Sequence, residues 1–213
     1  MHDTCVVIMA KQPLPGLAKT RIAATLGEEY AAILAEQLLL HTLNKVQQMT
    51  QQTTFSVCAV LCVAPQINPY FEHLAQRYKT ALIVQVEGDL GARMQAAASY
   101  ALNLAQQVII IGTDCPELNI QHITQARKSL DQADVYLQPA HDGGYVLVAL
   151  KESLGAVFEG KPWSTPVLMT KTLSDLTQAG IRYALGEYLN DIDEADDLVY
   201  LPSSFSRPQE VMQ

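Results

Sequence analysis

Short apolar runs alternate along this chain with longer stretches that have a helical period. The run Thr4–Ala10 is almost wholly apolar, which is typical of a strand buried on both faces. From Thr20 to about Gln48 the apolar residues repeat every three or four positions, which predicts a helix that Gly27 interrupts near its start. The run Val108–Gly112 is the clearest buried strand in the chain.

The same pattern continues to about residue 185. It predicts further strands at Phe55–Ala64, Ala81–Val86, Asp134–Ala140, Tyr145–Leu150 and Ile181–Leu185, and further helices from Pro69 to Tyr78, Leu90 to Gln106, Asn119 to Leu130 and Pro166 to Ala179. Alternating strands and helices of these lengths predict an α/β protein with a mainly parallel sheet covered on both faces. The short turn around Asp142 predicts an antiparallel hairpin in the later half.

Length indicates one domain, which we place at residues 1–201. Residues 202–213 have no period and are predicted to form a loose tail. In open α/β sheets, ligands bind outside the carboxyl ends of the strands. The polar residues that follow each strand are therefore the ones to examine for chemistry.

Charge excludes several kinds of partner. The chain has 14 Lys and Arg against 22 Asp and Glu, a net charge of −8. This balance argues against sequence-independent binding of nucleic acid and against an anionic membrane surface, since both require an excess of basic residues. No signal segment or bilayer-spanning run is evident, so we expect a cytoplasmic protein without membrane insertion whose four cysteines are reduced.

A basic loop follows the first predicted strand. Lys11, Lys19 and Arg21 lie within 11 positions, and Gly16 between them lets the backbone approach a ligand closely. A helix that starts near Ala18 would add its N-terminal amide groups. The loop therefore predicts a polyphosphate site, with a solvated basic loop as the alternative. The spacing is neither that of a Walker loop nor that of a dinucleotide-binding fingerprint.

Single carboxylates follow two other predicted strands. Asp114 comes directly after the strand Val108–Gly112, where it could bind Mg²⁺ or Mn²⁺ beside the phosphates, or cap the next helix. Asp142 precedes two glycines, a pattern that favours a turn and also suits a residue that binds or deprotonates a hydroxyl. Asp191 and Asp193 could each give a metal its second ligand, or belong to a solvated acidic stretch.

Taken together, six segments resemble one bacterial family. In chain order they are KQPLPGLAKTR, QVEGDLGARM, IIIGTDCPEL, PAHDGGYVLVAL, WST and DIDEADDL. The family is that of the GT-A-like proteins called glycosyltransferase-like, or radical-SAM/selenodomain-associated, transferases. Its wider relatives are nucleotide-diphospho-sugar transferases, including the molybdenum-cofactor and 2-phospho-lactate guanylyltransferases. The resemblance covers about Val6 to Leu198 and implies a single-domain, three-layer α/β/α GT-A fold.

The resemblance also implies residue roles. It implies that the phosphates contact Lys11, Gly16, Lys19 and Arg21, that the base lies near Gln85, Gly88 and Gly91, and that the acceptor contacts Asp142, Gly143, Gly144, Tyr145, Trp163 and Thr165. Lys19 and Asp142 would then be the catalytic residues, and Asp114 would bind the metal together with Asp193 or Asp191. Two departures matter: Gly112 stands where a DxD motif would have an acid, and Glu194-Ala195 replaces the usual Thr-Pro.

These observations predict a metal-dependent transferase that acts on a nucleotide-activated substrate, with an NDP-sugar as donor. The basic loop equally suits a triphosphate, so a nucleotidyltransferase that releases pyrophosphate is the alternative. The absent DxD motif leaves open a nucleotide-binding partner protein without turnover. The expected ligands are a nucleotide or nucleotide-sugar and Mg²⁺ or Mn²⁺, and the sequence leaves open whether the protein forms a homodimer.

Overall fold

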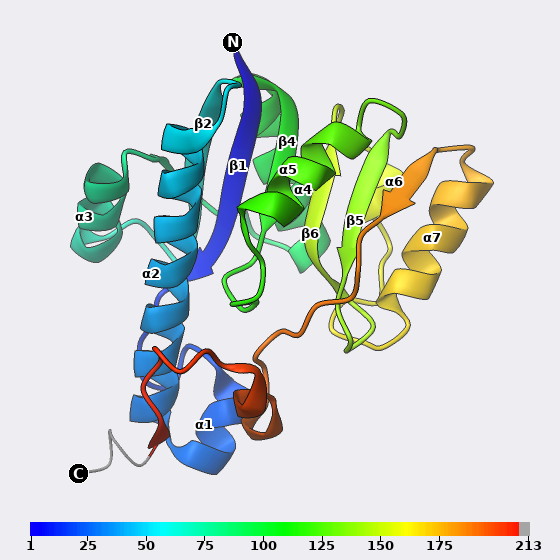
Figure 1. Ribbon diagram of the computed structural model, residues 1–213. Helices are drawn as coiled ribbons and strands as arrows, with labels where there is room; N and C mark the ends of the chain where they lie inside the picture. The colour runs from blue at the N-terminus through cyan, green and yellow to red at the C-terminus, as the bar shows by residue number, and fades with distance from the viewer. Residues whose placement is uncertain (209–213) are drawn as a thin grey trace.

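The computed structural model describes residues 1–208 and shows a seven-stranded sheet between two layers of helices (Figure 1). The strands are β1 (His2–Lys11), β2 (Val57–Ala64), β3 (Ala81–Val84), β4 (Ala105–Ile111), β5 (Val135–Pro139), β6 (Tyr145–Leu150) and β7 (Tyr183–Leu185). The α-helices are α1 (Thr20–Leu26), α2 (Glu28–Gln52), α3 (Pro69–Tyr78), α4 (Leu90–Leu102), α5 (Ile120–Ser129), α6 (Gly155–Phe158) and α7 (Leu168–Gln178), and η1 (Ala195–Tyr200) is a 3₁₀ helix.

The strand order is β3-β2-β1-β4-β6-β5-β7. Only β6 runs antiparallel to its neighbours β4 and β5, and all other pairs are parallel. The predicted parallel sheet with an antiparallel hairpin in the later half is confirmed. Because β1, β2, β3 and β4 are parallel, their carboxyl ends meet at one edge of the sheet, and β6 begins at that same edge.

Alternate residues of the central strands enter two separate cores. In β1, Val6 and Ile8 pack with α2, α3 and α5 on one face of the sheet. Cys5 and Val7 pack with α4, α6 and α7 on the other. This alternation follows from the two-residue repeat of a strand. It explains why the strand is apolar throughout, since both of its faces are covered.

A third, smaller core lies beyond the carboxyl edge of the sheet. It joins α1, the first turns of α2 and the C-terminal segment through residues such as Ile22, Leu34 and Ile192. Figure 1 shows this segment crossing below the sheet and ending beside α2. Phe205 is 5% exposed, and Ser206 exchanges hydrogen bonds with Gln37. The predicted loose tail is therefore wrong for residues 202–208, because Phe205 completes this core, and residues 209–213 lie outside the described part.

Two of the differences between observed and predicted element boundaries have a clear local cause. Gly27 has a φ of 86° and separates α1 from α2, so the expected interruption of the first long helix is a complete break. The predicted helix Leu90–Gln106 is too long, because α4 ends at Leu102 and Ala105 already pairs with His2 at the start of β4. The alanine-rich composition continues past the turn and hides this boundary.

Two further expectations concern the whole chain. All four cysteines are free thiols, and three of them, Cys5, Cys62 and Cys115, are buried. Across residues 1–208, no helix is both long enough and apolar enough to cross a membrane.

Candidate functional site

A cavity of about 550 Å³ opens at the carboxyl edge of the sheet. It brings together twelve of the residues singled out from the sequence: Lys11, Lys19, Arg21, Gln85, Asp114, Asp142, Gly144, Tyr145, Trp163, Thr165, Asp191 and Asp193. They come from the ends of β1, β3 and β4, the start of α1, the turn before β6, the loop before α7 and the segment before η1. A cavity of this size suits a small-molecule ligand.

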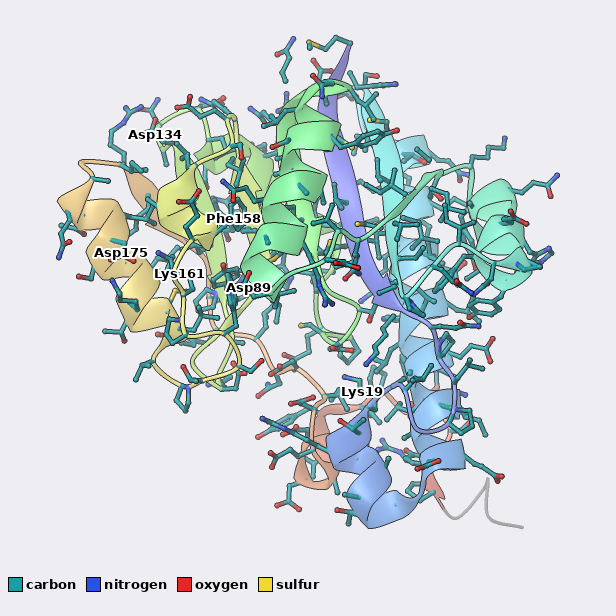
Figure 2. The ribbon with its side chains drawn as sticks, turned by 180° about the vertical axis from the view of Figure 1, so that it is seen from behind. Lys19, Asp89, Asp134, Phe158, Lys161 and Asp175 are labelled. Carbon is teal, nitrogen blue, oxygen red and sulfur yellow. The ribbon has the colours of Figure 1, made fainter. Side chains whose placement is uncertain are left out.

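Lys19 connects the basic loop to the acid that follows β4. Its Nζ lies 2.6 Å from Asp114 Oδ1 and also donates to the carbonyl of Ile192. The Lys19 side chain is only 5% exposed, whereas that of Asp114 is 50% exposed. Lys19 lies between α1 and the sheet edge (Figure 2). The basic loop and Asp114 therefore meet in one place, and the lysine is an internal cation of the site.

The other two cations of the loop are more exposed. Arg21 Nη1 lies 2.9 Å from Asp193 Oδ2 and 3.3 Å from Glu194 Oε1. Lys11 ends β1 with an exposed side chain and has no ion pair among the described residues. The helix expected near Ala18 begins instead at Thr20, and the Ala18 N–H donates to the Leu14 carbonyl. That amide is therefore not available to a ligand.

Four carboxylates balance these cations. Asp191 is partly buried, and its pKa is raised to about 6 by desolvation and by the charges of Asp142, Asp114 and Asp193. Such a shift is expected where several acids crowd into a partly dry site. With all groups ionised, the three cations and four acids give the cavity a net charge of −1. The described charges of the cavity therefore do not, in sum, favour an anion.

The segment that carries Asp191 and Asp193 is fastened to the loop after β4. Ile192 N donates to the carbonyl of Asp114 at 2.8 Å. Glu117 accepts from the backbone N of Asn190 at 2.8 Å and from its side-chain amide at 3.2 Å. Sequence reasoning missed Glu117, although it lies three residues after Asp114 in a motif already singled out. Its role is visible only once residues 114–117 and 190–193 are known to be neighbours.

The other end of this segment is held by Asp197. Its Oδ2 accepts from the backbone N of Asp193 at 2.9 Å and from that of Glu194 at 2.7 Å. Asp196 and Asp197 lie in the first turn of η1. The Glu194-Ala195 departure from the family pattern therefore leaves an ordered turn in place.

Asp142 forms the turn that its sequence favours and also faces the cavity. Asp142 Oδ1 accepts from Gly144 N at 2.8 Å, which is the bond of a turn, and Asp142 also lines the cavity. Gly143 has a φ of 90°, and a Cβ there would lie 2.2 Å from the carbonyl oxygen of Pro166. Only glycine lets the turn sit this close to the loop before α7. Gly143 itself does not line the cavity.

Gln85 lies where β1, β2 and β3 end together. Its Nε2 donates to the carbonyls of Ala10 and Cys62 at 3.2 and 3.1 Å. These bonds fix the amide and leave Oε1 as an acceptor without a partner in the part of the chain that the structure describes. Gln85 is thus the residue near β3 that is best placed to contact a ligand.

Besides Gly143, three other predicted glycines do not line the cavity. Gly16 and Gly88 are exposed turn residues with φ values of 76° and 121°. Gly91 is buried in α4, where a Cβ would lie 2.2 Å from the carbonyl oxygen of Phe158 and 2.8 Å from the Trp163 ring. Its role in the structure is close packing.

An aromatic pair forms one end of the cavity. The rings of Tyr145 and Trp163 meet edge to face, with centroids 6.2 Å apart. Burial raises the pKa of the Tyr145 hydroxyl. Neither Tyr145 Oη nor Trp163 Nε1 has a hydrogen-bond partner among residues 1–208. Thr165 Oγ1, by contrast, donates to the Pro162 carbonyl at 2.7 Å.

The donor set of the cavity bears on metal binding. Within the described residues, no group of three or more His, Cys, Asp or Glu side chains is arranged to hold a metal ion together. Mg²⁺ commonly uses one or two carboxylates, with the remaining positions filled by phosphate oxygens and water. The carboxylates of Asp114, Asp191 and Asp193 suit that mode by chemistry, and the net negative charge of the cavity favours a cation.

Solved structures share this fold. A candidate nucleotide-diphospho-sugar transferase from Desulfovibrio desulfuricans G20 is 26% identical, with a TM-score of 0.80 over 97% of this chain and 91% of that one. 4-Diphosphocytidyl-2C-methyl-D-erythritol synthase from Anaerococcus prevotii is 10% identical, with a TM-score of 0.61 over 93% and 94%. The inositol-1-phosphate CTP transferase from T. maritima is 12% identical, with a TM-score of 0.55 over 95% and 93%.

These likenesses establish the nucleotide-diphospho-sugar transferase fold expected from the sequence motifs. No curated protein matches the chain. One family model, described as an uncharacterized protein conserved in bacteria, matches residues 43–165, which is more than half of the 213 residues. The chain therefore belongs to this bacterial family, DUF2064.

Proposed function

We propose that this protein is a nucleotide-dependent transferase that moves a glycosyl group from an NDP-sugar to an acceptor with the help of a divalent cation. One observation carries the proposal: Lys19 of the basic loop and Asp114 after β4 form an ion pair in a cavity that also contains Lys11, Arg21, Asp142 and Asp191. The fold, shared with a candidate nucleotide-diphospho-sugar transferase, supports the same function.

Asp114 would hold the cation together with Asp193 or Asp191 and the phosphates of the donor. A bound Mg²⁺ or Mn²⁺ neutralises charge that develops on the phosphates. The net charge of −1 in the cavity supports a role for such a cation in binding a diphosphate. The ion pair with Lys19 holds the Asp114 side chain in place, and an ammonium group has a third N–H for a phosphate oxygen.

The remaining residues bind and orient the two substrates. Lys11 and Arg21 contact the phosphates from the β1 side, and Gln85 Oε1 accepts a hydrogen bond from the base. Asp142 Oδ2, which has no hydrogen bond within residues 1–208, orients the acceptor hydroxyl and removes its proton. Positioning and electrostatics then supply most of the acceleration, and loss of one such contact costs on the order of 3 kcal/mol in barrier height.

Nucleotidyl transfer from an NTP is the second candidate. It is favoured by the likeness in fold to a CMP:2-keto-3-deoxy-manno-octonic acid synthetase solved with CTP, with a TM-score of 0.58 at 13% identity. Lys19 and Arg21 each have an acidic partner, so among the cavity's described cations only Lys11 is left unpaired. This favours a diphosphate as ligand, because it carries less negative charge than a triphosphate. Release of nucleoside diphosphate from an NDP-sugar supports glycosyl transfer, whereas release of pyrophosphate from an NTP supports the second candidate.

The first experiment is a thermal-shift screen of NTPs and NDP-sugars with Mg²⁺, Mn²⁺ or EDTA. A ligand present at 100 times its Kd should stabilise the protein by about 2.7 kcal/mol. We expect the shift to need the cation and to disappear in Asp114→Asn, as checked by calorimetry. Cation-dependent binding that survives unchanged in Asp114→Asn would contradict the metal assignment. Tight binding without product from any donor would favour a nucleotide-binding partner protein.

A further inference from the structure

Every cation that lines the cavity within residues 1–208 comes from the end of β1 or the start of α1: Lys11 ends β1, and Lys19 and Arg21 lie at the start of α1. Another part of the lining, here called the acceptor half, is formed by Asp142, Gly144, Tyr145, Trp163, Ser164 and Thr165. These residues come from the turn before β6 and from the loop before α7. Among the described residues that line it, the acceptor half has one carboxylate and no cation.

Cations that are close in sequence to the acceptor half make contacts outside it. Lys161 is 7% exposed, and its Nζ lies 2.5 Å from Asp175 Oδ2, so it is neutralised below the surface. Lys171 pairs with the other oxygen of Asp175. Figure 2 shows Lys161 and Asp175 near α7. His141 precedes Asp142, but its ring lies tilted against that of Tyr188, with centroids 5.4 Å apart, and does not line the cavity.

The groups that remain can bind hydroxyls and rings. Ser164 is exposed at a φ of 60° and has no hydrogen bond in the described part of the chain, so its hydroxyl is available to a ligand. The Oδ2 atom of Asp142 can accept a hydrogen bond from a hydroxyl or an amine. Tyr145, Trp163 and Leu168 add aromatic and apolar surface beside these groups.

A carboxylate or phosphate placed here would meet Asp142 without a cation from the described residues to balance it. Like charges a few ångströms apart in a partly dry site repel strongly. A basic group would instead be attracted by Asp142, and a neutral hydroxylated ring would bind without an electrostatic penalty. The arrangement therefore selects ligands by charge as well as by shape.

We propose that the acceptor half binds a hydroxylated ring that is uncharged or basic, and that it rejects acceptors bearing a carboxylate or a phosphate. This inference rests on the proposed function and specifies its second substrate. A transferase that joins a nucleotide to a sugar phosphate would need a cation to balance that phosphate, and the described residues of the acceptor half include none.

Three sugars that share the same ring but differ in charge test the inference: D-glucosamine, D-glucose and D-glucuronate. Their binding to the full chain in the presence of Mg²⁺ is measured by ligand-observed NMR titration. We expect glucosamine and glucose to bind, and glucuronate to bind roughly tenfold more weakly or worse, which corresponds to about 1.4 kcal/mol. Equal or tighter binding of glucuronate would overturn the inference, as would failure of all three sugars to bind.

A charge reversal provides the second arm. Asp142→Lys should reverse the order, so that glucuronate becomes the tightest of the three. Asp131→Lys makes the same charge change at an exposed residue outside the cavity and should leave the order unchanged. An order that is the same in Asp142→Lys as in the wild type would refute the role of Asp142. Circular dichroism checks that both variants are folded.

Nucleotide binding is measured on the same samples, which separates the two hypotheses. Charge-selective sugar binding without any nucleotide binding would contradict the proposed function and leave the present inference standing. Cation-dependent nucleotide binding with a preference for glucuronate would do the opposite.

Discussion

Lys19 Nζ lies 2.6 Å from Asp114 Oδ1 and joins the first helix of the chain to the end of the central strand β4. The lysine is nearly inaccessible, and the same ammonium group donates to the Ile192 carbonyl. Three segments that are distant in the sequence thus meet at one buried cation. Each of them brings an acid or a base into the cavity, so this ion pair organises the site as well as stabilising it.

Replacing this lysine tests its structural role. Lys19→Met keeps the length of the side chain but leaves Asp114 without its partner, and we expect a loss of about 1–3 kcal/mol in unfolding free energy. The additional substitution Asp114→Asn should restore part of it. Urea denaturation measures both. Arg21→Met removes exposed ion pairs and should cost less than about 1 kcal/mol. A double mutant no more stable than Lys19→Met would show that the pair is not coupled.

The link between Glu117 and Asn190 gives a second prediction. Glu117→Ala leaves the Asn190 amide groups without their acceptor, so residues 190–193 should exchange amide hydrogens faster and stability should fall by about 1–2 kcal/mol. Glu117→Gln keeps a carbonyl acceptor and should lie between the wild type and Glu117→Ala. Glu152→Ala alters an exposed acid elsewhere and serves as the control. Unchanged exchange at residues 190–193 would show that Glu117 does not hold them.

The sequence predicts this fold well because each buried strand is apolar on both faces. The run Val108–Gly112 is predicted as a buried strand from its apolar residues alone, and the polar residues that follow it line the cavity at the edge of the sheet. Contacts between segments that are distant in the sequence could not be predicted in this way. Nothing local distinguishes Lys19, which is buried and paired with Asp114, from Lys11, which is exposed at the end of β1.

The roles of the glycines could not be predicted from the sequence either. Gly16, Gly88 and Gly91 stand in motifs that suggest ligand contact, yet Gly91 is required by packing against Phe158 and Trp163. A glycine that admits a ligand and one that admits a neighbouring backbone have the same sequence signature, because both simply lack a Cβ. The prediction of a loose C-terminal tail failed for a related reason: Phe205 is one apolar residue in an aperiodic stretch, and its burial depends on a pocket made by α1 and α2.

The Asp142 turn depends on Gly143, which leads to a third prediction. A Cβ at this residue would meet the Pro166 carbonyl at 2.2 Å in addition to the strain of a φ of 90°. Gly160 also has a positive φ, 62°, but a Cβ there would have nothing within 4 Å. We expect Gly160→Ala to cost about 1–2 kcal/mol and Gly143→Ala clearly more, because only the latter adds a steric clash. Thermal denaturation compares them, and equal losses would mean that the loop before α7 moves away easily.

The crowding of acids around Asp191 gives a prediction on pH. Its pKa is raised to about 6 in the folded protein, from 3.8, first by desolvation and then by the charges of Asp142, Asp114 and Asp193. The folded state therefore binds more protons than the unfolded state between these two values. The stability that this group contributes is complete below pH 3.8 and is lost as the pH rises through 6.

Asp191→Asn removes that penalty. In EDTA, we expect the variant to gain roughly 1–2 kcal/mol over the wild type at pH 7, a value discounted because the carboxylate is partly in water, and to gain almost nothing near pH 4. Urea denaturation at several pH values measures the difference. Asp142→Asn removes one of the repelling charges and should reproduce part of the gain with the same pH dependence. Equal effects of Asp191→Asn at both pH values would contradict the raised pKa, and with it the close approach of the four carboxylates on which the proposed cation site depends.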